Sequence, residues 1–309
     1  MWLRITEGFA LSLKHAAAAA CLLLQVWVVS VQAAGSTEKH LEAARLELLR
    51  RSDADSLAAA GVLTAQHNRS QALALVSKAA DAAPERADLV WLQLMLCQQA
   101  PSCDSEALEQ RLRHLDPSNG AAWMGALLRA GAARDDAAIA GALAGLSQSE
   151  RTDIYWTTLM GRLSGAAGRS GKVSGDEAVV AVTGLLAAQI IPAYTLVSRS
   201  CKADAPEALE RCRGIARSFQ RGDTFITEMI GVAIAKRVWP AGSPEWKAAD
   251  KARRLYDYRS KLWLEVEGRP TTRSTKRLLA LCSEYRREQD VFRQQIVDAG
   301  RNPDPPGGT

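Results

Sequence analysis

Apolar side chains recur along the chain at the three- and four-residue spacing of amphipathic α-helices. Between residues 105 and 115, for example, Leu108, Leu112 and Leu115 fall on one helical face. The segment 87–97 is apolar almost all round, which predicts a helix enclosed by its neighbours. No stretch shows the sustained alternation of a β-strand bounded by hairpin turns. The sequence therefore predicts an all-α chain of about a dozen helices.

Capping residues and prolines mark several of the expected helix boundaries. Ser243-Pro244-Glu245 combines a serine cap, a proline suited to the first helical position and an acidic residue favoured by the helix dipole. Pro206 also suits a first helical position. Gly222-Asp223-Thr224 is expected to end one helix and to cap the next.

Three tryptophans, Trp91, Trp123 and Trp156, are spaced 32 and 33 residues apart, close to the roughly 34-residue period of paired helical repeats. The segments 84–91 and 149–156 also match, with Glu, Arg, Asp and Trp in register. We therefore expect these tryptophans to pack inside a repeated structure, as its internal spine.

The segment Leu115-Asp116-Pro117-Ser118-Asn119, followed by Ala122-Trp123, resembles the turn and first helix of a tetratricopeptide repeat. In that family, Asp-Pro and a small polar cap precede a Trp at the fourth helical position. The resemblance covers about residues 70 to 165. It implies antiparallel helix pairs in an α-solenoid arrangement, followed here by a further helical region. The C-terminal half resembles uncharacterised exported bacterial proteins that carry Cys-Arg, Gly-Asp-Thr and Trp-Pro.

Changes in composition predict five parts of the chain. They are a signal peptide (1–33), a repeat region (34–163), a Gly/Ser-rich linker (164–175), a basic helical region (176–299) and a disordered tail (300–309). Residues 34–198 contain 15 basic and 18 acidic side chains, whereas residues 199–309 contain 22 basic and 15 acidic ones. The two halves thus differ in net charge. The basic half could bind a different partner, or its basic residues could simply lie on the solvated faces of long helices.

The N-terminus has the pattern of a secretory signal. Two basic residues, Arg4 and Lys14, come before an apolar run that covers residues 16 to 31. The small residues at the end of this segment allow cleavage after Ala33. This predicts a periplasmic or secreted protein. Two alternatives are an uncleaved helix anchored in the inner membrane, for which the run is short, and a lipoprotein site at Cys21.

Cysteine spacing agrees with export to an oxidising compartment. The natural disulfide pairs are Cys97 with Cys103 and Cys201 with Cys212, which leaves Cys282 over. The alternative is that these side chains are small buried hydrophobes.

Catalytic and metal-binding motifs are not recognised in the sequence. His40, His67 and His114 fall on different expected helices, and none has a second histidine at ligand spacing. The glycine-rich segment 168–172 fails as a phosphate loop because Val173 stands where Ser or Thr would coordinate magnesium. We therefore expect a protein that is not an enzyme and that needs no cofactor and no metal.

One turn in the basic region carries candidate ligand contacts. Trp239 and Trp246 bracket it, and the nearby cations are Lys236, Arg237, Lys247, Lys251, Arg253 and Arg254. These residue types could meet an anionic ligand.

Two functions follow from these patterns. The first is a non-catalytic scaffold that binds a protein or peptide, because stacked helix pairs create recognition surfaces. The alternative is a binder of anionic cell-envelope polymers or lipid head groups through the basic region. Nucleic acid is not an expected partner of an exported protein.

Overall fold

A computed structural model describes residues 34–98, 100, 103–189, 193–201, 206–267 and 274–306. Every regular element within these ranges is a helix, which confirms the all-α prediction. The predicted signal peptide, residues 1–33, lies outside the described residues.

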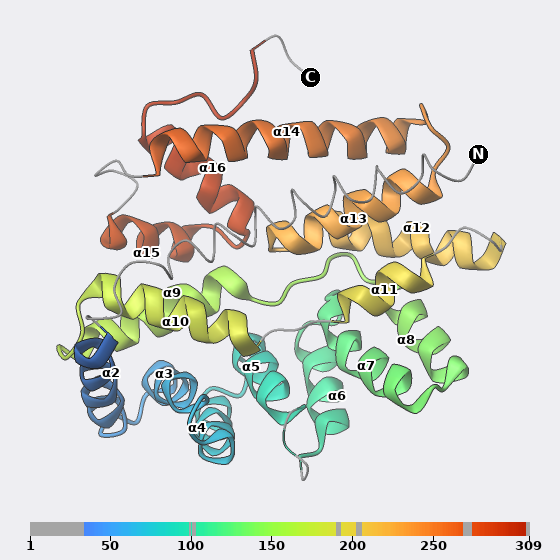
Figure 1. Cartoon of the computed structure of the whole chain (residues 1–309). Helices are drawn as coiled ribbons and strands as arrows, with labels where there is room; N and C mark the ends of the chain where they lie inside the picture. The colour runs from blue at the N-terminus through green and yellow to red at the C-terminus, as the bar shows by residue number, and fades with distance from the viewer. Residues whose placement is uncertain are drawn as a thin grey trace.

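The first half of the described chain forms a curved row of helices, coloured blue to green along the lower part of Figure 1. Consecutive helices of the row pack against one another. The members are α2 (Ala34–Leu48), α3 (Ala54–Thr64), α4 (Arg69–Ala82), α5 (Ala87–Cys97), α6 (Ser105–Leu115), the 3-10 turn η1 (Gly120–Trp123), α7 (Met124–Ala133) and α8 (Asp136–Gln148).

The second half folds back over one side of this row. Its helices are α9 (Trp156–Arg169), α10 (Gly175–Gln189), α11 (Tyr194–Ser200), α12 (Pro206–Gln220), α13 (Phe225–Val238), α14 (Pro244–Val266), α15 (Thr275–Glu284) and α16 (Glu288–Asp298). Helix α9 contacts α2 and α3, while α12 packs on α8; the long α14 lies on α13 and α16 at the top of Figure 1. One side of the row is therefore covered by the protein itself.

Two large hydrophobic clusters hold these layers together, and each contains residues from both halves. Leu48 of α2 belongs to the same cluster as Leu281 of α15. Leu146 of α8 belongs to the second cluster together with Phe219 of α12. The segment 164–175, expected to separate two regions, does not divide the hydrophobic core.

The three tryptophans do not form one continuous spine. Trp91 is fully buried in the first cluster, and the partly buried Trp156 packs against that cluster. Trp123 packs against the second cluster instead, with the Arg113 guanidinium 4.5 Å from its ring centroid. The regular spacing in sequence thus places Trp91 and Trp156 at one cluster and Trp123 at the other.

The expected linker is mostly helical. Residues 164–169 complete α9, so only residues 170–174 form a turn before α10. The backbone N–H of Glu177 donates to Ser174 Oγ at 3.2 Å, and the Ser174 N–H donates to the Glu177 carboxylate at 2.8 Å. This reciprocal capping box starts α10 and gives Ser174 a structural role.

Of the expected disordered tail, residues 301–306 contact α14, and residues 307–309 lie outside the described residues. Arg259 Nε donates to the Pro303 carbonyl at 3.1 Å, and the same guanidinium lies 3.0 Å from the Asp304 carboxylate. Pro303 is buried. Side-chain contacts with α14 override the local preference of a proline-rich segment for disorder.

Both predicted disulfides are present. Cys97 and Cys103 link the end of α5 to the start of α6, with their Cα atoms 5.3 Å apart. Cys201 and Cys212 link the end of α11 to α12, with their Cα atoms 5.4 Å apart. Cys282 is buried and unpaired. The bridges are typical of proteins from an oxidising compartment.

Candidate functional site

The predicted ligand turn contains cations that already have partners within the chain. Lys236 Nζ lies 2.5 Å from Asp250 and 4.6 Å from the ring centroid of Trp246. Arg254 pairs with the same carboxylate. Asp250 thus forms ion pairs with two of the cations that were expected to bind an anionic ligand.

The two other arginines predicted to bind a ligand at this turn also bond within the chain. Arg237 donates to the carbonyls of Ser198 and Cys201, at 3.0 and 3.1 Å, so it caps the end of α11. Arg253 pairs with Asp257 at 3.0 Å, one helical turn further along α14.

Trp239 is buried rather than open to a ligand. Only 8 % of its surface is exposed. The guanidinium carbons of Arg213 and Arg217 lie 6.0 and 5.9 Å from its ring centroid. Trp239 belongs to the second hydrophobic cluster, and the partly buried Trp246 packs against that cluster.

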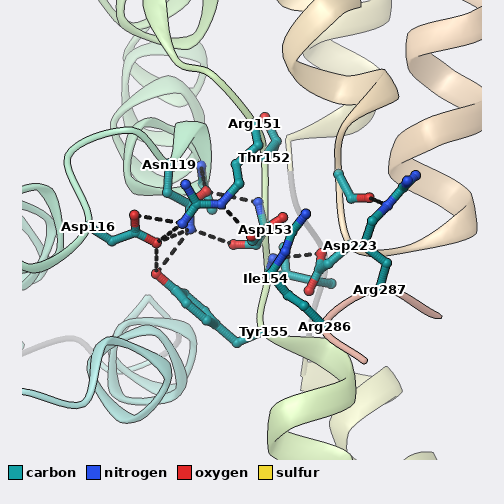
Figure 2. A network of polar contacts seen from close by, with 12 residues as sticks. Asp116, Asn119, Arg151, Thr152, Asp153, Ile154, Tyr155, Asp223, Arg286 and Arg287 are labelled. Carbon is teal, nitrogen blue, oxygen red and sulfur yellow. Dashed lines mark hydrogen bonds and ion pairs between the residues drawn. The ribbon is translucent and has the colours of Figure 1, made fainter. Parts of the chain in front are cut away.

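A dense polar network lies instead where α8 leads into α9, and Figure 2 shows it from close by. The connecting segment, residues 151–155, runs beside Asn119 of the row. The Asp153 N–H donates to Asn119 Oδ1 at 2.8 Å, and Asn119 Nδ2 donates to the Asp153 carbonyl at 2.9 Å. The Gly120 N–H donates to the Arg151 carbonyl at 2.7 Å. These bonds fix the segment in an extended form.

Arg151 and Tyr155 converge on Asp116 at one side of the network. Arg151 Nη2 lies 2.8 Å from the Asp116 carboxylate, and the Tyr155 hydroxyl donates to Asp116 Oδ2 at 2.7 Å. Burial and the Asp116 charge both raise the pKa of the Tyr155 hydroxyl. Tyr155 has a left-handed backbone, with φ of 57°, which costs energy for a non-glycine residue and is held by these contacts.

The Arg-x-Asp pair of this segment also occurs in the matching segment of the repeat. Arg151 Nε lies 2.7 Å from Asp153, and Arg86 Nε donates to Asp88 at 2.8 Å. The guanidinium of Arg86 also lies 2.8 Å from Asp55. The two backbones differ, because α5 begins directly after Arg86 whereas α9 begins five residues after Arg151.

Asp223 joins the second half of the chain to this segment. Its two carboxylate oxygens accept the N–H groups of Ile154 and Trp156, both at 2.9 Å. Asp223 therefore caps α9, while the neighbouring Thr224 caps α13 by accepting the Thr227 N–H. Asp223 has no exposed surface. Burial and the nearby Asp153 charge raise the pKa of Asp223 to about 7.

The loop before α16 completes the network with two arginines. Arg286 pairs with the buried Asp153 carboxylate. Arg287 Nε donates to the Gly222 carbonyl at 3.1 Å, and its Nη2 lies 3.2 Å from Glu228 of α13. We name the network formed by residues 116, 119, 151–155, 223, 228 and 286–288 the joint, because it connects the helical row to the covering layer.

Glu288, the first residue of α16, binds the start of α13. Its carboxylate accepts the Phe225 N–H at 2.9 Å, and its own N–H donates to the Asp223 carbonyl at 2.8 Å. Burial raises the pKa of Glu288 to about 7. The joint thus holds the first turns of α9, α13 and α16 in one place.

An aromatic cluster lies next to the joint, where α13, α14 and α16 meet. Phe225 is 5.0 Å from Phe292 and 5.4 Å from Tyr256, measured between ring centroids, and Trp263 is 4.8 Å from Phe292. All four rings are partly buried and belong to neither of the large hydrophobic clusters. We name residues 225, 256, 263 and 292 the aromatic cluster.

Large exposed apolar side chains adjoin this cluster in the sequence. Ile226 and Leu264 each expose 58 % of their surface.

The described part of the chain holds no group of three or more His, Cys, Asp or Glu side chains arranged for a metal ion. The joint brings three arginines and the first turns of three helices together. None of the described helices is long and apolar enough to cross a bilayer.

Sequence reasoning identified Asp223 only as part of a local stop-and-cap signal, and it assigned no role to Arg286, Arg287 or Glu288. The matching Arg-x-Asp at residues 86–88 and 151–153 was the signal that could have led to Asp153. No protein-family model matches the sequence, and the searches of curated proteins and of solved structures gave no match.

Proposed function

We propose that the protein is an exported, non-catalytic helical scaffold that binds another protein or a peptide. The observation that carries this proposal is the aromatic cluster with its exposed apolar neighbours Ile226 and Leu264. Aromatic side chains at a surface supply large contact areas with few rotatable bonds, and they dominate the energy of protein interfaces.

The place of contact differs from the one that a repeat alone suggests. In an open solenoid, the stacked helix pairs would offer the face that α9, α10 and α12 cover here. We therefore assign recognition to the outer layer, around α13, α14 and α16. Export is supported by the two disulfides and by the signal-like segment 1–33.

The alternative, a binder of anionic envelope polymers or lipid head groups, has less support. Lys236, Arg237, Arg253 and Arg254 all bond within the chain, so part of the charge and hydrogen-bonding capacity of this turn is already used.

Site-specific photo-crosslinking tests the proposal. A photoreactive amino acid is placed at Leu264 in one variant and at Val180 of α10 in a matched control, since these side chains expose 58 % and 56 % of their surface. After irradiation of intact cells, we expect a reproducible crosslinked protein from position 264 and none from position 180. Equal products from both positions, or none from position 264, would contradict the proposal. A Leu264→Asp change should abolish capture at a probe on Ile226, whereas Val180→Asp should not.

A further inference from the structure

The long helix α14 carries three arginines and three lysines, and the two kinds of residue differ in their surroundings. Each arginine has a carboxylate partner within the chain: Arg253 with Asp257, Arg254 with Asp250 and Arg259 with Asp304. The side chains of Lys247, Lys251 and Lys261 are exposed, and they form no ion pair with another residue of the described part of the chain. The cations that α14 leaves without a partner are therefore its lysines.

The three lysines lie on one side of α14. Lys251 and Lys261 follow Lys247 by four and fourteen residues, which is about one and about four turns of an α-helix. At 1.5 Å per residue, they extend over about 21 Å along the helix. Helix α14 packs on α13 and α16 and lies at the outer edge of this layer in Figure 1. We name residues 247, 251 and 261 the lysine face.

The carboxylates of α14 do not cancel this charge. Three of them are already bound to other cations: Asp250 to Lys236 and Arg254, Asp257 to Arg253, and Glu265 to Arg301. Glu245 is exposed and has no ion-pair partner among the described residues, but it lies in the first turn, where the helix dipole favours an acidic side chain. The lysine face is therefore positively charged.

The C-terminal segment contacts α14 without using these lysines. The Tyr258 hydroxyl donates to the Asn302 carbonyl at 3.3 Å, and Arg259 Nε donates to the Pro303 carbonyl at 3.1 Å. The chain's own tail thus occupies a neighbouring part of α14 and leaves the lysine face open to a partner.

The lysine face ends beside the contact residue of the proposed function. Leu264 follows Lys261 by three residues, so the two side chains are neighbours on the helix surface. Of the large apolar side chains that are exposed in the described part of the chain, Leu264 alone belongs to α14. A single apolar side chain offers little area to insert into a lipid surface. The same residue is sufficient as one anchor in a contact with a protein segment.

We propose that the lysine face binds an acidic segment of the partner protein, which places carboxylates opposite Lys247, Lys251 and Lys261 and an apolar side chain against Leu264. This inference rests on the proposed function and extends its contact surface along α14. Complementary charges accelerate association and exclude basic partners. Because the lysines are exposed, the attraction weakens as the ionic strength rises.

Fluorescence anisotropy with two synthetic peptides tests the charge of the partner. The first is a labelled helical peptide of about 16 residues that combines a leucine stripe with glutamates, and the second carries lysine in place of each glutamate. We expect the purified protein to bind the glutamate peptide, with at least about tenfold weaker affinity at about 500 mM than at about 50 mM NaCl, and not to bind the lysine peptide. Equal binding of both peptides, or binding of neither, would overturn the proposal.

Two triple variants locate the binding of the glutamate peptide. Lys247→Glu/Lys251→Glu/Lys261→Glu should weaken it by at least about tenfold. The matched control, Lys39→Glu/Lys78→Glu/Lys172→Glu, changes three exposed lysines of the first half and gives the same net charge; it should weaken binding by less than about twofold. Equal weakening in the two variants would show an effect of net charge alone and would overturn the proposal. Binding to phosphatidylglycerol vesicles without binding to the glutamate peptide would do the same.

Photo-crosslinking at Leu264 in intact cells separates this inference from the proposed function. A protein that is captured equally by the wild type and by the lysine-face variant would contradict only the present inference. Lysine-dependent peptide binding without any protein captured in cells would contradict only the proposed function. Capture by the wild type and by the control variant, with loss of capture in the lysine-face variant, is the outcome expected if both hold.

Discussion

Asp223 caps the helix that begins at Trp156, although 67 residues separate them: its carboxylate accepts the Trp156 N–H at 2.9 Å. A cap usually comes from the residue directly before the helix, but here Tyr155 stands there in a left-handed conformation and its side chain donates to Asp116. The chain therefore uses the cap as a tertiary contact between its two halves.

Replacement of Asp223 by alanine should destabilise the protein strongly. The N–H groups of Ile154 and Trp156 would lose their acceptor in a buried place, at a cost of about 2 to 4 kcal/mol in the free energy of unfolding. Urea denaturation at pH 6 measures this cost. Asp136→Ala, at the exposed start of α8, should change it by less than about 1 kcal/mol. If Asp223→Ala lowers the free energy of unfolding no more than Asp136→Ala does, Asp223 does not act as a tertiary cap.

Two glycines of α8 should respond in opposite ways to alanine. A Cβ at Gly145 would lie 2.3 Å from ring atoms of Trp123, whereas one at Gly141 would meet nothing within 4 Å. We expect Gly145→Ala to destabilise the fold by about 1 to 3 kcal/mol, and Gly141→Ala to stabilise it by about 0.5 to 1 kcal/mol. Thermal unfolding of the two variants measures the difference; the same sign for both would disprove the packing described for Trp123.

Loss of either disulfide should lower stability moderately. Each bridge closes a short loop, with sequence separations of 6 and 11, and the chain-entropy model gives about 2 to 3 kcal/mol for loops of this size. Serine pairs at Cys97/Cys103 and at Cys201/Cys212 test the cost by urea unfolding. Mass-spectrometric mapping of non-reduced peptides should recover the same two pairs, and Cys282 should react with alkylating agents only after unfolding. A different pairing would contradict the structure.

Removal of the C-terminal segment should also have a measurable effect. Truncation after Gly300 removes the carbonyl and carboxylate that Arg259 contacts, and it exposes the α14 surface covered by Pro303. We expect a loss of about 1 to 2 kcal/mol. Truncation after Pro306 leaves these contacts in place and is the matched control. Equal melting temperatures for the two truncated chains would argue against docking of the tail.

Local sequence signals predicted the helices and several of their boundaries correctly. Ser243 caps α14 with Pro244 in its first turn, and Pro206 begins α12, as expected. These features depend on backbone preferences within a few residues, which a sequence reveals directly. The disulfides were predictable for the same reason, since short separations in sequence keep paired cysteines close.

The joint could not be predicted in this way, because its bonds connect residues far apart in the chain. Asp223 was grouped with Thr224 as a local cap, and only Thr224 acts locally. Similarly, Lys236 and Arg254 were expected to be available cations, but Asp250 binds both. The residue types showed that these side chains would bind an anion. That this anion is the carboxylate of Asp250 depends on how α13 and α14 pack.

The mixed composition of the two hydrophobic clusters constrains when the protein can fold during its synthesis. The cluster that begins with Ala44 also includes Leu281 and Val291, so the first helices to emerge lack the partners that complete their core. A chain that is extruded from one end, from a ribosome or through a translocation pore, reaches its final structure only when α15 and α16 have appeared.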